Sequence, residues 1–148
     1  MRVLLQRVSE ASVAIDNKVH ASIGKGLLVL VGVESDDSED DEDWLVKKIT
    51  QMRIFEDENG KMNRSLVDLN EELLVISQFT LHASTKKGNR PSFIKAARPE
   101  QAIPAYERFI KKCSEHVSTK SGVFGADMNI VLQNYGPVSI WLDSKQRE

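Results

Sequence analysis

The stretch Ser77-Gln78-Phe79-Thr80 places two hydroxyls, an amide and an aromatic ring directly after the apolar run Leu73–Ile76. This run, with two β-branched members, predicts a buried strand, and a long polar loop from Ser84 to Arg90 follows it. Polar side chains where a strand enters a loop are a frequent arrangement in catalytic sites. The same pattern also ends strands that carry no chemistry, so by itself it is a hypothesis.

Two kinds of chemistry fit this stretch. Thr80 and His82 are two positions apart, so on an extended strand their side chains share a face and could form part of a triad. The chain has no Gly-x-Ser-x-Gly elbow, however, and we expect His82 to be a surface residue on the loop side. The alternative is chemistry by the backbone, because free main-chain N–H groups at a strand end can polarise a carbonyl as an oxyanion hole.

A second stretch, Gly136-Pro137, is a candidate partner for the first. Glycine allows another molecule to approach the backbone closely. The cis form of an X-Pro bond costs only about 0.5–1 kcal/mol, so a fold can hold the bond in cis and direct a carbonyl. The same dipeptide is also common in ordinary turns, and the residues alone leave both interpretations open.

The elements that position these stretches indicate one α+β domain over residues 1–148. Apolar or alternating runs predict strands at residues 2–8, 11–15, 19–23, 27–33, 53–55, 73–80, 123–133 and 138–142. Apolar residues at helical spacing predict one helix from Ser38 to about Met52 and another over residues 99–116. Residues 61–72 are expected to be irregular, 118–122 a loop and 134–137 a turn. We therefore expect mainly antiparallel strands in a sheet or barrel, with two main helices.

Composition restricts the class of protein. The 148 residues suffice for one domain with a core, and 41% hydrophobic and 28% charged residues are ordinary for a soluble globular protein. We expect no membrane span and no signal peptide, because no apolar run is long enough for either. The single cysteine, Cys113, cannot form an intrachain disulfide, and we expect it in the core. Together these features favour the cytoplasm.

The charges are unevenly distributed although the net charge is only −2. Eight of the ten residues from Glu34 to Asp43 are acidic, and a basic segment includes Lys86, Lys87, Arg90, Lys95 and Arg98. One acidic face and one basic segment suit a protein that docks a polyanion in one orientation, although a mixed solvated surface is equally compatible. The three histidines are far apart without ligand-like spacing, so we expect no metal and no cofactor.

Short motifs along nearly the whole chain decide what the separate residues leave open. In chain order they are Gln6-Arg7-Val8, Gly26-Leu27-Leu28-Val29-Leu30, Arg53-Ile54-Phe55, Gly60-Lys61-Met62-Asn63, Ser77-Gln78-Phe79-Thr80-Leu81, Arg90-Pro91-Ser92-Phe93, Ala126-Asp127-Met128 and Gly136-Pro137-Val138. Each motif is weak alone, but the ordered set is specific. With them the chain resembles the D-aminoacyl-tRNA deacylases of the bacterial and eukaryotic type.

The resemblance implies hydrolysis of the ester that joins a D-amino acid, or glycine, to the terminal ribose of tRNA. It also implies a homodimer with two active sites at the subunit interface. Ser77, Gln78, Phe79 and Thr80 would line the pocket, and Gly136 and Pro137 would enter from the other subunit through a cis bond. Their carbonyls would face the substrate's α-amino group and leave no room for an L side chain. Candidates for supporting the site or contacting the tRNA are Arg7, Lys86, Lys87 and Arg90.

Two mechanisms compete within this resemblance. Thr80 could be a covalent nucleophile, but the sequence offers it no firmly placed base. We favour attack by water, with a main-chain N–H near Phe79 or Thr80 stabilising the oxyanion and the ribose hydroxyl of the RNA assisting. Three positions depart from the family pattern: Tyr135 in place of Asp, Ser139 in place of Thr, and His82 in place of a small residue. The alternative functions are a non-catalytic tRNA-binding module and a serine hydrolase of small esters.

Overall fold

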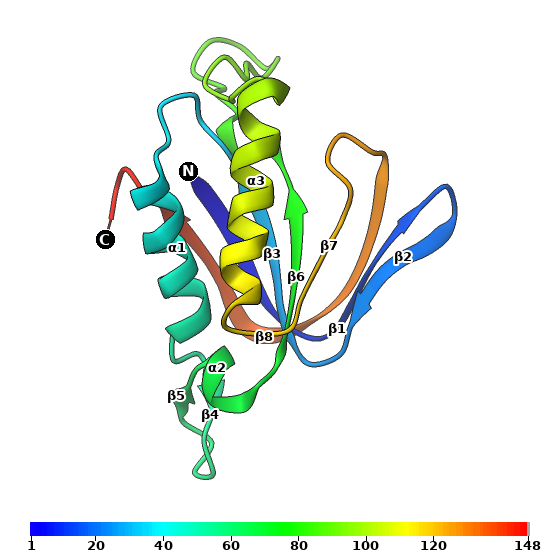
Figure 1. The fold of residues 1–148 in the computed structure, drawn as a ribbon, viewed down its shortest axis with the longest axis vertical. Coiled ribbons are helices and arrows are strands. Elements are labelled where there is room, and N and C mark those ends of the chain that lie inside the picture. The colour runs from blue at the N-terminus through cyan, green and yellow to red at the C-terminus, as the bar shows by residue number, and fades with distance from the viewer. Residues whose placement is uncertain (148) are drawn as a thin grey trace.

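Six strands form one mixed sheet, and two long helices, α1 and α3, cover one of its faces (Figure 1). The computed structural model describes residues 1–147. The strands of the sheet are β1 (Arg2–Ile15), β2 (Lys18–Ile23), β3 (Gly26–Gly32), β6 (Glu72–Ser77), β7 (Thr119–Ser121) and β8 (Met128–Asp143). The remaining elements are α1 (Glu39–Gln51), the small hairpin β4 (Phe55–Glu56) and β5 (Met62–Arg64), α2 (Leu66–Leu69), the 3₁₀ turn η1 (Phe79–His82) and α3 (Pro99–Ser114).

The long strand β1 organises the sheet. It pairs antiparallel with β2, β3 and β8, whereas β6 lies parallel to both β3 and β7. The strand β8 runs along almost the whole of β1 and forms an edge of the sheet (Figure 1). The predicted α+β fold with a barrel-like sheet and two main helices is confirmed, with parallel pairing at β6 as an addition.

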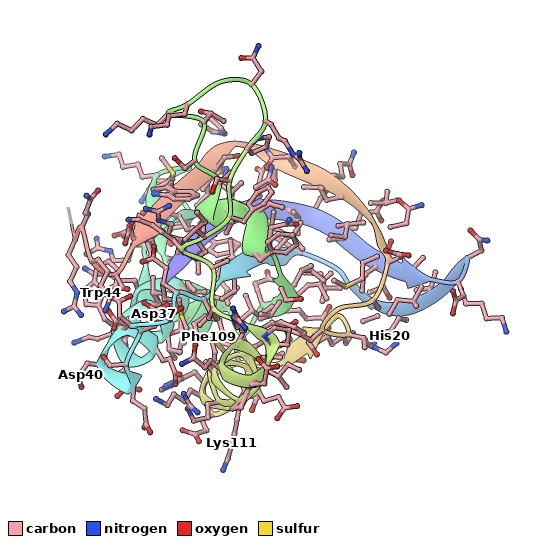
Figure 2. The ribbon with its side chains drawn as sticks, turned by 90° about the horizontal axis from the view of Figure 1, so that it is seen from above. His20, Asp37, Asp40, Trp44, Phe109 and Lys111 are labelled. Carbon is pink, nitrogen blue, oxygen red and sulfur yellow. The ribbon has the colours of Figure 1, made fainter. Side chains whose placement is uncertain are left out.

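The core lies on both faces of β3 and β6. Leu27 and Leu73 face the helices, where Phe109 of α3 also points inward while Lys111 points away from the sheet (Figure 2). Leu28 and Leu74 belong to a second, smaller cluster on the opposite face. Strands covered on both faces read as continuous apolar runs, which is why the sequence pattern identified them.

The expected helix start at Ser38 is confirmed. The Ser38 N–H donates to the Asp41 carboxylate over 2.9 Å, and four acidic residues occupy the first turn of α1. Negative charge there complements the helix dipole. Cys113 is fully buried on α3, as predicted, and its burial raises the pKa of the thiol to about 12. Among the described residues no helix is long and apolar enough to cross a membrane.

Several of the expected boundaries are wrong. The strand at the candidate site ends at Ser77 and is followed by η1, instead of continuing to residue 80. The segment 61–72 contains β5 and α2, and 118–122 contains β7. The start of α2 had a readable signal, because the Ser65 side chain accepts from the Asp68 N–H and the Asp68 carboxylate accepts from the Ser65 N–H.

The largest difference concerns the last strand. The segment 134–137, expected to be a turn, lies inside β8, which starts at Met128 rather than at residue 123. Two register shifts of the β1–β8 pairing, between Gln6 and Val8 and between Val8 and Glu10, absorb the irregular residues without ending the strand. The sequence analysis therefore predicted a chain reversal where the structure has a local irregularity within a continuous strand.

Gly26 is required by the close approach of β3 to β6. A Cβ on Gly26 would lie 1.9 Å from the main-chain oxygen of Glu72, whereas a Cβ on Gly24 would meet only the Glu72 side chain at 3.8 Å. We expect Gly26→Ala to lower the free energy of unfolding by about 3 kcal/mol or more, because two backbones would have to separate. Urea denaturation of both alanine variants measures this effect. A Gly26→Ala protein as stable as Gly24→Ala would contradict it.

Candidate active site

A cavity of about 330 Å³ opens beside the end of β6. Ser77, Gln78 and Phe79 form one wall of it. The other walls come from β3, α3 and the segment that leads into β8, and they are largely apolar, with Tyr106 and Phe124 among them. The Tyr106 hydroxyl donates to the main-chain oxygen of Val75 over 2.9 Å, and burial raises the pKa of this hydroxyl well above its usual value. Tyr106 therefore lines the cavity with its hydroxyl engaged by the backbone of β6.

The turn η1 begins beside the cavity: Phe79 lines it, whereas Thr80, the next residue, is not among the lining residues. The Gln78 N–H donates to the Val31 oxygen over 2.7 Å, and the Leu81 N–H donates back to the Gln78 oxygen over 3.3 Å. Between them, the N–H groups of Phe79 and Thr80 have no partner among the hydrogen bonds of residues 1–147. Such free donors beside a cavity have the character of an oxyanion hole.

The structure separates Thr80 from His82. The Thr80 hydroxyl is exposed and accepts a hydrogen bond from the Gln78 side-chain amide. His82 is only 1% exposed, and its Nδ1 lies 3.4 Å from Glu34 Oε1. The expectation of a surface histidine, and of a shared face with Thr80, is therefore wrong. A 3₁₀ turn rotates about 120° per residue, so positions two apart point in different directions, unlike those on a strand.

An aromatic pair and a basic loop flank the cavity. Phe79 is 55% exposed, and its ring meets the ring of Phe93 edge to face with centroids 5.1 Å apart. Mutual main-chain hydrogen bonds between Ser84 and Ser92, at 2.8 and 2.9 Å, close the loop between them. Its cations, Lys86, Lys87 and Arg90, are all exposed. The loop lies beyond the N-terminal end of α3 in Figure 1.

The Gly136-Pro137 bond is cis, and Arg7 holds the backbone around it. The guanidinium donates to the main-chain oxygens of Gly136, Tyr135 and Ile54 over 2.9, 3.1 and 2.5 Å. It also lies 4.4 Å from the centre of the Tyr135 ring. Arg7 is 1% exposed, so little of its side chain is accessible to a nucleic acid.

The two predicted halves of the site do not meet within one chain. Neither Gly136 nor Pro137 is among the residues that line the cavity beside Ser77. Both lie on β8, which pairs only with β1 in the described part of the chain, and both are exposed. The same strand exposes the apolar side chains of Val131 and Trp141. The sequence did not indicate Tyr106, Phe124 or Glu34 as parts of this region.

Comparison with known proteins identifies the family. A family model described as D-Tyr-tRNA(Tyr) deacylase matches residues 4–143. The chain belongs to this deacylase family. A D-aminoacyl-tRNA deacylase from Cytophaga hutchinsonii is 60% identical and one from Bacteroides thetaiotaomicron is 57% identical, each over 100% of both chains.

Solved structures share the fold of this member of the deacylase family. The c-Myc DNA unwinding element binding protein superposes with a TM-score of 0.92 at 39% identity, covering 97% of this chain and 98% of that chain. A probable eukaryotic D-amino acid tRNA deacylase superposes with a TM-score of 0.84 at 17% identity, covering 95% and 97% of the two chains. The second likeness concerns the fold alone.

Proposed function

We propose that this protein hydrolyses the ester bond of D-aminoacyl-tRNA and releases the free D-amino acid and tRNA. The observation that carries the proposal is a turn beside a largely apolar cavity, in a chain of the deacylase family: Phe79 lines the cavity, and the N–H groups of Phe79 and Thr80 have no hydrogen-bond partner within residues 1–147. The aromatic rings of Tyr106 and Phe124 in the cavity wall suit an aromatic group such as the base of the terminal nucleoside. Because aminoacyl-tRNA is consumed by ribosomes, we place this activity in the cytoplasm.

The chemical step is attack by water on the ester carbonyl. The developing oxyanion accepts hydrogen bonds from the Phe79 and Thr80 N–H groups, and the neighbouring ribose hydroxyl of the RNA assists the proton transfer. One oxyanion donor is worth about 10²–10³ in rate in other hydrolases. No metal or cofactor enters this proposal.

Selection of the D enantiomer is assigned to Gly136 and Pro137 of a second subunit in a homodimer. Three features support this assignment: these residues lie on an exposed edge strand, the Gly136 carbonyl is fixed by Arg7, and neither residue reaches the cavity of its own chain. Their carbonyls would hold the substrate's α-amino group and exclude an L side chain. Glycine has no side chain to exclude, so glycyl-tRNA is a substrate as well. Sedimentation velocity should show a species of twice the 16.6 kDa chain mass.

The decisive experiment compares D-Tyr-tRNA with L-Tyr-tRNA. We expect release of tyrosine from the D form only. Binding of both without release would indicate the non-catalytic tRNA-binding module. Inactivation by serine-directed phosphonates together with cleavage of free esters would indicate the small-ester hydrolase.

The basic loop should contribute affinity and not chemistry. We expect the triple change of Lys86, Lys87 and Arg90 to glutamine to weaken tRNA binding at least about tenfold. The slope of the logarithm of the binding constant against the logarithm of the salt concentration should become less steep by about two. The single-turnover rate at saturating enzyme should stay unchanged. Filter binding at several salt concentrations and quenched-flow deacylation measure the two quantities. An unaltered salt slope would remove the loop from the tRNA interface.

Thr80→Ala separates the two mechanisms. With water as the nucleophile, we expect a loss of only about threefold, because the alanine keeps the main-chain N–H that stabilises the oxyanion. A covalent threonine would make the loss several orders of magnitude at unchanged tRNA affinity. Rapid-quench measurement of D-Tyr-tRNA hydrolysis decides, and Thr80→Ser provides the control that restores a hydroxyl.

A further inference from the structure

Behind η1, a histidine and a glutamate face each other in a buried space. The His82 side chain is fully buried, the Glu34 side chain is nine-tenths buried, and His82 Nδ1 lies 3.4 Å from Glu34 Oε1. In the part of the chain that the structure describes, Glu34 Oε1 and both ring nitrogens have no hydrogen-bond partner. Buried polar atoms are almost always paired in folded proteins. A single proton between Nδ1 and Oε1 would pair both atoms at once.

The backbone of β3 fixes the orientation of the imidazole ring. A Cβ on Gly32 would lie 2.8 Å from His82 Nε2 and 3.0 Å from the main-chain oxygen of Gln78. The ring and the start of the turn therefore pack directly on a residue that has no side chain. This packing turns Nε2 toward Gly32 and Nδ1 toward Glu34.

The same turn carries the two free main-chain donors of the proposed site. It is tied to β3 at its start by the Gln78–Val31 hydrogen bond, and the Arg2 guanidinium donates to the Leu81 oxygen over 3.3 Å. His82 is the last residue of the turn. Anchors at both ends therefore fix the position of the turn that carries the N–H groups of Phe79 and Thr80.

Other charged groups approach Glu34 but do not replace His82. Lys95 Nζ is 4.0 Å from Glu34 Oε1, and its side chain is exposed. On the other side, the Asp37 carboxylate accepts from the Glu34 main-chain N–H over 2.7 Å and pairs with the Met1 ammonium. Of these groups, the His82 imidazole is the buried one that can donate a hydrogen bond to Glu34 Oε1.

We propose that His82 donates its Nδ1 proton to Glu34 and that this buried pair positions the oxyanion donors of η1. His82 is a positioning residue in this proposal, since it acts through the main chain of Phe79 and Thr80. The proposal rests on the proposed function, because its kinetic test measures deacylation. It adds a residue pair that the motif Ser77-Gln78-Phe79-Thr80 does not include.

Two isosteric substitutions test the direction of the hydrogen bond. In His82→Asn the amide nitrogen takes the place of Nδ1 and can still donate to Glu34, whereas in His82→Gln it takes the place of Nε2 and faces Gly32. We expect the Asn variant to keep the single-turnover rate within about threefold and the Gln variant to lose at least about tenfold. The tRNA affinity of both should be unchanged. Equal rates of the two variants, or a faster Gln variant, would overturn the proposal.

His20→Asn and His20→Gln are the matched controls. His20 is exposed on β2 and lies at the opposite end of the molecule from Asp37, as Figure 2 shows. Both variants should deacylate D-Tyr-tRNA at the rate of the unchanged protein. A loss similar to that of His82→Gln would mean that the assay reports general damage, and it would overturn the assignment to the buried pair.

The tautomer of His82 can be measured in the unchanged protein. We expect ¹⁵N NMR to show the proton on Nδ1 at neutral pH, with the resonance identified by its loss in the Asn variant. A proton on Nε2 alone would overturn the pair even if the Gln variant did not fold. This measurement does not depend on activity. A protein that failed to cleave D-Tyr-tRNA would contradict the proposed function, while the tautomer would still decide the pairing.

Discussion

Gly136→Ala is expected to lower the single-turnover rate of D-aminoacyl-tRNA deacylation by about two orders of magnitude while the fold stays intact. Within the chain, a Cβ at this position would meet only the Asn134 side-chain nitrogen, at 3.8 Å. The added methyl therefore costs the folded chain little. It would instead occupy the space that the α-carbon substituents of the substrate need under our proposal. Quenched-flow kinetics and thermal unfolding measure the two quantities.

Asn129→Ala is the control for this prediction, because it adds an alanine at an exposed position of the same strand. It should change neither the rate nor the stability. A Gly136→Ala protein with the normal rate would show that the substrate does not approach Gly136. A slow Gly136→Ala protein that had also lost stability would place the effect in the fold and contradict the argument from open space.

Arg7→Ala is expected to lower the free energy of unfolding by about 3 kcal/mol or more, since it removes the donor from the buried main-chain oxygen of Ile54 and from the partly buried oxygens of Tyr135 and Gly136. Arg7 donates to the carbonyls of Gly136, Tyr135 and Ile54, and it packs against the Tyr135 ring. Deacylation should fall at least about a hundredfold, because the Gly136 carbonyl loses the donor that fixes its direction. Urea denaturation and single-turnover kinetics below the denaturation midpoint measure both effects.

Arg7→Lys and Arg64→Ala are the comparison variants for this prediction, the first at the same position and the second at a surface arginine. Lysine keeps the charge but cannot present donors to three carbonyls in the fork geometry of arginine, so we expect an intermediate loss. Arg64 is half exposed and pairs with Glu58 at 3.6 Å, a surface contact worth about 0–1 kcal/mol. Full stability and full activity of Arg7→Lys would contradict the role of the three-carbonyl network.

The elements with a clear periodicity or a continuous apolar run were predictable, because these patterns show directly which faces of the element are buried. The run Leu27–Val31 and the run Leu73–Ile76 are covered on both faces, and α1 starts at the expected cap Ser38. Predictions from short sequence patterns were wrong where contacts between residues distant in sequence determine the backbone conformation. The residues 134–137 look like a turn, but the register shifts of the β1–β8 pairing keep them within a strand.

The sequence by itself determined the α+β class, the family resemblance through its ordered motifs, and the two stretches Ser77-Gln78-Phe79-Thr80 and Gly136-Pro137 as the candidate site. These properties depend on residue identity and order along the chain. Only the tertiary structure decided how the stretches are arranged and supported. It turns the strand end into a 3₁₀ turn with free N–H groups, buries His82 against Glu34, and places Arg7 under the Gly136 carbonyl. Each of these outcomes depends on residues that lie 47 to 129 positions apart in the sequence, a separation at which periodicity and turn rules carry no information.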